Sequence, residues 1–182
     1  MITSIILAAG EGSRMGTLKQ LLPWQGSTII ETVISNISAC KFVEGEIRVV
    51  LGAESERVKT VLNDNHSEKE ELKIIKNEDY QRGMLSSVRE GLIDLPEGTE
   101  YVMLSLGDQP LITEDIYNEV LSELNKVRPE IMVPVTEGKR GHPLVFSTDY
   151  VDEIFELPGP GGLRRLLERH EDKIYHYPLG DK

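Results

Sequence analysis

The sequence predicts an α/β protein with a mostly parallel β-sheet that has helices on both faces. Two observations favour this class. Short apolar runs typical of buried strands alternate along the chain with segments whose apolar residues recur at helical spacing. One of these runs, "YVMLSL" at 101–106, is apolar almost throughout, which is typical of a strand covered on both faces. In such a sheet, ligands bind at the carboxyl ends of the strands.

The first half of the chain predicts three strands, each followed by a helix. The first helix carries five apolar residues at helical spacing and has Ser27 or Thr28 as its N-cap. In chain order, the expected elements are strand 4–9, helix 28–40, strand 47–52, helix 54–63, strand 72–77 and helix 84–95. The residues expected to face inward from the last two helices are Val58, Val61, Leu62, Leu85, Val88, Leu92 and Leu95.

The second half continues the pattern with less regular spacing. The helix expected at 114–126 has Thr113 as its cap and turns Ile116, Val120, Leu121 and Leu124 inward. Around it, the expected elements are strand 101–106, strands 131–135 and 142–146 joined by "TEGKRG", helix 149–157, the turn "PGPGG", helix 163–170 and strand 173–179. We expect one domain over residues 1–182, because a chain of this length buries roughly 70% of its unfolded surface around one core.

Composition and charge exclude several classes of protein. The hydrophobic fraction is 39% and no apolar run approaches the ~20 residues of a membrane span, so no membrane protein is expected. A net charge of −11 argues against a broad nucleic-acid-binding surface. The charge still allows a small cationic cleft, with a divalent cation adding to it. The candidate cations are Arg14 with Lys19, Arg82, Lys139 with Arg140, and Arg164 with Arg165.

The cysteine and the first residues indicate the cytoplasm. Cys40 is the single cysteine, so it forms no internal disulfide, and we expect a quiet buried thiol near the end of an apolar helix. The first residues begin a strand pattern without a basic region or a small-residue cleavage site, so no secretory signal is expected.

The loop after the first strand, "LAAGEGSRMGTLKQLLPW" at 7–24, carries three glycines and two cations. Gly10, Gly12 and Gly16 are spaced one residue too widely for a dinucleotide fingerprint, and Gly16 is not followed directly by Lys-Ser/Thr as in a P-loop. Glycines let backbone amides approach an anion, while Arg14 and Lys19 supply donors and charge to phosphate. From spacing alone, a phosphate loop and a tight turn with solvated cations are equally good interpretations.

Asp108 follows the fourth strand in "LGDQP". A carboxylate at the end of a buried strand is placed to hold a divalent metal against a phosphate. The alternative is a turn or capping aspartate, since Asp-x-Pro favours turns. A phosphate loop on the same edge strengthens the metal interpretation.

Three further groups have a chemical and a structural interpretation. Ser86 and Ser87, after Gly83, either bond a base or ribose or cap a helix. His142 lies between strands, where a histidine is more often structural than catalytic. No residue set predicts a zinc site, and there is no Gly-x-Ser-x-Gly nucleophile elbow.

Several segments together resemble a known family. "LAAGEGSRMGTLKQLLP" resembles the signature Leu-Ala-Ala-Gly-x-x-x-Arg-Met-Gly-x-x-Lys of the MobA-like nucleotidyltransferases. "GMLSSVREGL", "LGDQPL", "GHPLVF" and "GPGGLRRLL" resemble further motifs of the molybdenum cofactor cytidylyltransferases within that family, in the same order. The resemblance spans nearly the whole chain, and its serine loop is the basis for cytidylyl rather than guanylyl transfer.

The resemblance implies a single nucleotidyltransferase domain with a Rossmann-like, GT-A type α/β/α fold. It implies transfer of CMP from CTP to molybdenum-bound molybdopterin, with release of pyrophosphate, and a molybdenum hydroxylase as client. Related reactions are guanylyl transfer and transfer onto a sugar or alditol phosphate. Carried over to this sequence, Arg14 and Lys19 would neutralise the triphosphate, Asp108 would hold Mg²⁺, and His142 would face the pterin. The nucleotide would contact Leu7, Ala8, Ala9, Gly10, Gly12, Gly16, Gly83 and Ser87.

The sequence departs from the family at its end. The family has a second carboxylate after the last strand, in a segment resembling Asp-x-Asp-Thr-Pro, whereas this chain ends at "YPLGDK". No spacing argument supports Asp181 as a substitute. The departure therefore keeps open a second class of function, a non-catalytic molybdenum cofactor chaperone.

Overall fold

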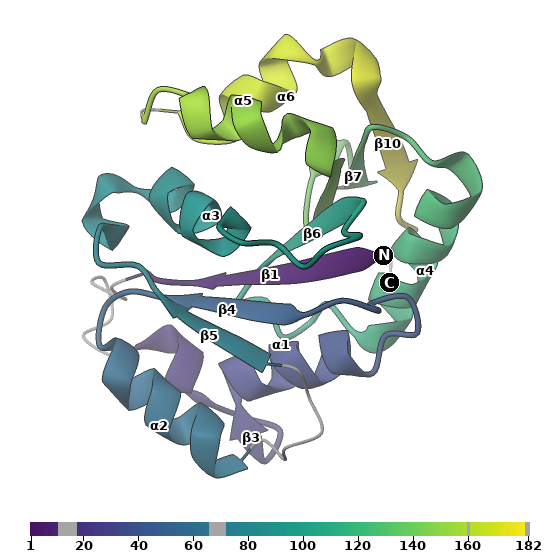
Figure 1. The fold of residues 1–182 in the computed structure, drawn as a ribbon. Helices are drawn as coiled ribbons and strands as arrows, with labels where there is room; N and C mark the ends of the chain where they lie inside the picture. Colours follow the sequence, from purple (N-terminus) through teal and green to yellow (C-terminus); the bar gives the residue numbers. More distant parts are fainter. Residues whose placement is uncertain (11–17, 66–71, 160, 181–182) are drawn as a thin grey trace.

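The protein's structure, a computed structural model, describes residues 1–10, 18–65, 72–159 and 161–180. The described residues form an eight-stranded sheet between two layers of helices (Figure 1). Its strands are β1 (Ile2–Ala8), β4 (Ile47–Leu51), β5 (Leu72–Lys76), β6 (Tyr101–Leu106), β7 (Ile131–Thr136), β8 (Lys139–Arg140), β9 (Leu144–Ser147) and β10 (Ile174–Pro178). The predicted α/β class is confirmed.

The sheet is mostly parallel, and its order reverses at β1. The order is β10-β7-β9-β6-β1-β4-β5, with β8 paired to β7. β1 is parallel to β4 and β6, β4 to β5, and β7 to β10, whereas β9 is antiparallel to β6 and β7. The chain builds outward from β1 to β5 and then returns to place β6 on the other side of β1. The carboxyl ends of β1 and β6 are therefore the point where ligands bind in open α/β sheets.

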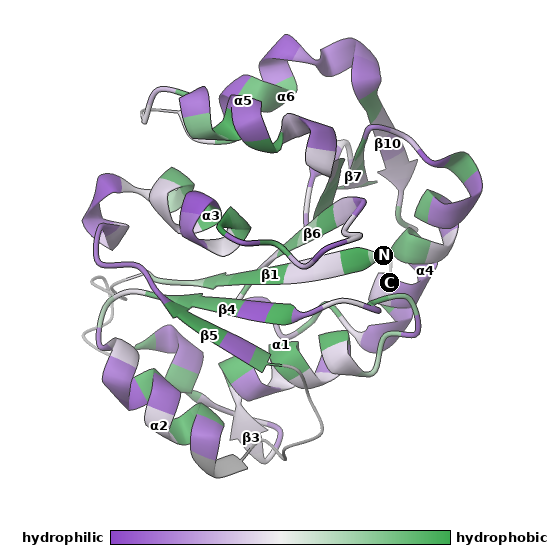
Figure 2. Cartoon of the chain, in the orientation of Figure 1, coloured by the Kyte–Doolittle hydropathy of each residue, from purple (hydrophilic) through white to green (hydrophobic). Residues whose placement is uncertain are grey.

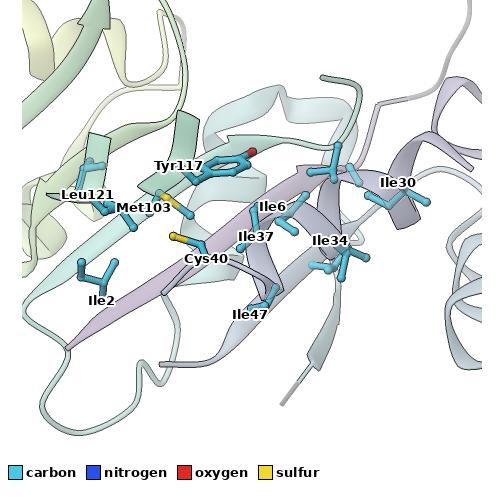
Figure 3. Close-up of a cluster of buried hydrophobic side chains, with 14 of the residues drawn as sticks. Ile2, Ile6, Ile30, Ile34, Ile37, Cys40, Ile47, Met103, Tyr117 and Leu121 are labelled. Atoms are coloured by element: carbon cyan, nitrogen blue, oxygen red, sulfur yellow. The ribbon is translucent and has the colours of Figure 1, made fainter. Parts of the chain in front are cut away.

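Side chains of β1 alternate between two cores, one on each face of the sheet. Ile6 packs in one core, and Ile5 and Leu7 pack in the other. The first core, drawn in Figure 3, is covered by α1 (Ile29–Ser38), α2 (Ser55–Asn65) and α4 (Glu114–Val127), and the second by α3 (Met84–Leu92), α5 (Val151–Glu156) and α6 (Arg164–Arg169). Figure 2 shows β1 as largely hydrophobic, while the helices mix both kinds of residue. The helices are thus amphipathic covers of a buried sheet.

The sequence predicts N-cap residues for α1 and α4, and the structure places a threonine at both positions. Thr28, one of the two predicted N-cap residues, caps α1, and it forms a capping box with Glu31. Thr113 is at the N-cap position of α4, but its side chain makes no capping hydrogen bond. The helix predicted to reach residue 95 ends at Leu92, because Ile93 is extended and Asp94 has a φ of 52°.

Burial and boundaries differ from prediction at a few positions. Tyr117, rather than Ile116, is the buried residue of the first turns of α4, and Val61 is only half-buried. Strand β1 begins two residues earlier than expected. Short elements that sequence periodicity does not reveal are η1 (Lys19–Leu21), the hairpin of β2 (Pro23–Trp24) and β3 (Ser27–Thr28), η2 (Tyr80–Arg82), η3 (Thr148–Tyr150) and η4 (Glu171–Lys173).

Cys40 is a buried free thiol just after α1, as predicted, and it donates a hydrogen bond to Asn118. Burial raises its pKa, which keeps the thiol protonated and unreactive. Within the described ranges, none of the helices has the length and apolar character needed to cross a bilayer.

Candidate active site

A cavity of about 360 Å³ opens at the carboxyl ends of β1 and β6. Its volume lies within the range of small-molecule sites. Residues from β1, β6, η1 and the start of α3 line it: Leu7, Ala9, Gly10, Gln20, Tyr80, Gly83, Met84, Ser87, Leu106 and Asp108. Because this is where the strand order reverses, the fold places the cavity where the sequence predicts a ligand site.

Gln20 contacts the backbone at the end of β1. Its side-chain amide donates to the carbonyl oxygens of Ala8 at 3.1 Å and Gly10 at 3.5 Å. The side chain is 6% exposed, and within the described part of the chain its Oε1 has no hydrogen-bond partner. Gln20 therefore fixes the backbone that borders the cavity and leaves one acceptor beside it. Gln20 was not predicted as a site residue, and its one signal in the sequence is a polar side chain directly before the apolar segment "LLP" at 21–23.

Asn77 holds the serine side of the cavity. It is 1% exposed, and its Nδ2 donates to the hydroxyl oxygens of Ser86 at 2.8 Å and Ser87 at 2.9 Å. Its Oδ1 accepts from the backbone amide of Asp79 at 2.9 Å, so this polar residue is satisfied. Asn77 was not predicted as a site residue, although an asparagine directly after a strand was a signal.

The two serines differ in what they do. The hydroxyl of Ser86 donates to the carbonyl oxygens of Gly83 and Asp79 and so closes the turn before α3. Ser87 is 3% exposed and lines the cavity. Neither occupies the N-cap of α3, which is Gly83 with a φ of 101°, a conformation that favours glycine. The capping interpretation is thus wrong for both serines.

Asp108 follows β6 and lines the same cavity as Ser87. The glycine before it is required, since a Cβ at Gly107 would lie 2.9 Å from the Ala8 Cβ and from the Ile30 side chain. This close packing brings the end of β6 against β1, and the exposed Asp108 carboxylate lines the cavity. The turn and the metal-holding interpretations of Asp108 are compatible with this position.

The donor set fits a hard cation that is shared with a ligand. Among the residues that the structure describes, no group of three or more His, Cys, Asp or Glu side chains gathers around one point. Asp108 is the one carboxylate among the described residues that line the cavity. Mg²⁺ is commonly bound by one or two carboxylates together with substrate phosphates and waters, so this arrangement fits it when a phosphate ligand supplies the rest.

The structure brings together six of the predicted site residues: Leu7, Ala9, Gly10, Gly83, Ser87 and Asp108. Ala8 is next to them but turns its carbonyl to Gln20. Lys19 is half-buried in η1 and is not among the lining residues. Gly12, Arg14 and Gly16 lie outside the described residues.

A second cavity, of about 540 Å³, shares Gly83 and Met84 with the first. His142 lines it, half-buried between β8 and β9. Burial lowers the pKa of the His142 imidazole, and the negative charge of Asp108 acts in the opposite direction. The His142 imidazole is therefore neutral near pH 7.

The sequence profile of the MobA-like NTP transferase domain matches residues 4–174 of the 182. The chain belongs to the MobA-like NTP transferase family. This MobA-like chain is 32% identical over 166 residues to the molybdenum cofactor cytidylyltransferase of Escherichia coli (strain K12), covering 91% of the chain and 80% of that protein. It is 30% identical over 137 residues to a probable molybdenum cofactor guanylyltransferase of Natranaerobius thermophilus, covering 75% and 62%.

Solved structures of the same fold support the architecture of this MobA-like chain. The crystal structure of Rv0371c from Mycobacterium tuberculosis H37Rv matches with a TM-score of 0.82 and 23% identity, covering all of this chain and 89% of that one. The same protein has also been solved in complex with manganese. The fold is thus Rossmann-like, and the MobA-like chain is a nucleotidyltransferase of the group that includes the cytidylyltransferases.

Proposed function

We propose that this MobA-like protein transfers CMP from CTP to molybdenum-bound molybdopterin and releases pyrophosphate. The observation that carries the proposal is the cavity at the β1 and β6 ends, which combines strand-end backbone, a buried serine hydroxyl and one carboxylate, and which adjoins a second cavity. The 32% identity to a molybdenum cofactor cytidylyltransferase supports this choice of substrates.

In this proposal, the nucleoside is held by the backbone of residues 7–10 and by Gly83 and Ser87. Polar atoms at Ala9, Gly10 and Gly83 border the cavity without bulky side chains, so a base and ribose can lie close to the main chain. Arg14 and Lys19 would neutralise the triphosphate, with Gly12 and Gly16 shaping their loop. Nucleotidyl transfer needs positioning and charge neutralisation more than covalent help, and these residue types supply both.

Asp108 would hold Mg²⁺ against the phosphates. When bound, the cation withdraws negative charge from the phosphate oxygens and favours departure of pyrophosphate. His142, neutral at pH 7, would face the acceptor in the second cavity without adding charge. A cytoplasmic setting and a molybdenum hydroxylase as recipient of the product belong to the same proposal.

Guanylyl transfer is the second candidate, since a probable molybdenum cofactor guanylyltransferase is 30% identical to this chain. The two reactions separate in one assay. The purified protein is incubated with Mg²⁺, molybdenum-loaded molybdopterin and either CTP or GTP, and pyrophosphate release is measured. We expect release with CTP in excess of GTP, whereas GTP preference would establish the second candidate and release from neither would contradict both.

The Asp108 carboxylate gives the first mutational prediction. Asp108→Asn keeps the side-chain shape but removes the negative charge, so we expect kcat for pyrophosphate release to fall at least about 100-fold. Asp152→Asn is the matched control, because Asp152 is exposed on α5 and lines neither cavity. Equal activities of the two variants would remove Asp108 from the metal site.

A further inference from the structure

The second cavity has an apolar interior built from both the sheet and two helices. Leu104, Val133 and Leu144 form its floor on β6, β7 and β9. Leu163 and Leu167 close it from the α6 side. The start of α3, at Gly83 and Met84, separates it from the first cavity. A ligand lying here would bury a flat or compact apolar body against these side chains.

Three arginines from three different elements line the same cavity: Arg82 of η2, Arg140 of β8 and Arg164 of α6. None of the residues that line it in the described structure is Asp or Glu. This is a selective concentration of positive charge, since the whole chain has a net charge of −11. The cavity therefore favours an anionic ligand over a neutral or cationic one.

The arginines are held by partners that a ligand can replace. Arg82 pairs with Asp79 at 2.9 Å and Arg164 with Glu168 at 2.8 Å, both largely in solvent. Arg140 is more firmly placed, because its Nη2 donates to the Glu171 carboxylate and its Nε donates to His176 Nε2 at 3.1 Å. Exposed ion pairs contribute little free energy, so exchange of the Asp79 and Glu168 partners of Arg82 and Arg164 for an anion costs little.

Lys139 and Arg165 are excluded from this arrangement. They neighbour Arg140 and Arg164 in the sequence, but neither lines the cavity. Of the cations that the sequence suggested for a cationic cleft, Arg82, Arg140 and Arg164 therefore line this cavity. Arg140 and Arg164 line the second cavity and, like Arg82, do not line the first.

We propose that Arg140 and Arg164 bind a second anionic group of the acceptor, distinct from the phosphate that attacks the nucleotide. This inference rests on the proposed function. The attacking phosphate must reach the first cavity and so lies at the wall formed by Gly83 and Met84. Arg82 directly precedes Gly83 at that wall, whereas Arg140 on β8 and Arg164 on α6 are left for another anionic centre on the same molecule. The acceptor is accordingly an amphipathic anion with charge at both ends of an apolar body.

A fluorescent probe tests the subsite without requiring activity. The probe is 1-anilinonaphthalene-8-sulfonate, a flat apolar molecule with one sulfonate. We expect saturable binding to the full chain, weakened about tenfold by Arg140→Gln or Arg164→Gln, because each removes a charge-assisted contact. Arg140→Lys keeps the charge and is expected to retain most of the affinity. Arg165→Gln is the matched control on the same helix, with a change below about twofold.

The uncharged analogue N-phenyl-1-naphthylamine separates charge from cavity shape. We expect its affinity to be the same in wild type, Arg140→Gln and Arg164→Gln. Equal loss of both probes, unchanged binding of the sulfonate by both variants, or displacement of the sulfonate by CTP in competition would overturn the inference. Failure of the proposed function has a different signature, which is absence of pyrophosphate release from CTP by the wild type with the probe results intact.

Discussion

Ser86 and Ser87 are adjacent, and both accept a hydrogen bond from Asn77, yet only Ser87 lines the active-site cavity. If Ser87 contacts the nucleoside, Ser87→Ala should weaken CTP binding about tenfold, because a hydrogen bond is lost and the Asn77 amide loses an acceptor. The dissociation constant of CTP with Mg²⁺, measured by isothermal titration calorimetry, checks this.

Ser86→Ala is the internal control for that measurement. Ser86 does not line the cavity, and its hydroxyl donates to the carbonyl oxygens of Gly83 and Asp79, so a change below about twofold is expected. Should Ser86→Ala weaken CTP binding as much as Ser87→Ala, the serines would act by shaping the loop rather than by contacting the nucleotide.

At the residue scale, sequence could predict side chains whose place follows from a strand end. Asp108 lies two residues after a predicted strand and Gly83 directly before a predicted helix, and the rule that ligands lie at carboxyl ends is enough to bring them together. Gln20 and Asn77 could not be predicted in the same way. Their roles depend on hydrogen bonds to backbone or hydroxyl groups of other segments, which leave no periodic pattern in the sequence.

At the element scale, α3 is the helix whose position matters most, since its first residues border both cavities. Arg48, completely buried on β4, donates to the carbonyl oxygens of Gly91, Ile93 and Asp94 at the end of this helix and pairs with Glu46 at 2.8 Å. A buried cation at a helix C-terminus satisfies its unpaired carbonyls and its dipole.

Arg48→Met should therefore cost about 3 kcal/mol in the free energy of unfolding, because three carbonyls lose their donor and Glu46 loses its partner. Urea unfolding followed by circular dichroism measures it. Arg57→Met is the comparison, since Arg57 forms an exposed pair with Glu54 at 3.2 Å and its loss should cost less than about 0.5 kcal/mol. Similar losses for both variants would show that Arg48 contributes no more than a surface pair.

Helix periodicity and apolar runs were sufficient to locate the main strands and helices, but not this contact. In "IRVVLG" the arginine interrupts an apolar strand, and the strand pattern alone does not tell whether such a residue is buried. The early end of α3 at Leu92 could not be predicted either, because it depends on the same contact with Arg48. The chain leaves the helix where Arg48 binds its carbonyls, and a residue 43 positions away supplies that donor.

For the whole molecule, the class of sheet could be predicted but its order could not. Alternation of strands and helices indicates parallel pairing, whereas β9 lies antiparallel between β6 and β7. This insertion brings His142 beside the carboxyl end of β6. Its imidazole and the Asp108 carboxylate thus come from segments that only the tertiary structure brings together.

Three carboxylates in the elements on and around the β10 edge of the sheet have pKa values below their ordinary value of 4.5. Hydrogen bonds from Lys173 and Tyr150 lower the pKa of Glu130, those from His170 and Arg169 lower that of Glu153, and one from Arg140 lowers that of Glu171. Glu130 and Glu171 join the segment that leads into β10 to the rest of the sheet, through Lys173 and Arg140. Glu153 joins α5 to the end of α6, through Arg169 and His170. The edge therefore depends on ionised carboxylates more than the center of the sheet does.

A folded-state pKa below the unfolded value means that the stabilisation is complete above pH 4.5 and is lost as the pH falls through the folded-state pKa. We therefore expect acid to release β10 before β1. Amide exchange protection factors at pH 6 and pH 3.5 should fall more for 174–178 than for 2–8. The triple variant Glu130→Gln, Glu153→Gln, Glu171→Gln should show the weak β10 protection already at pH 6, with little further change on acidification. Parallel loss of protection in both strands would instead mean that acid acts on the fold as one cooperative unit.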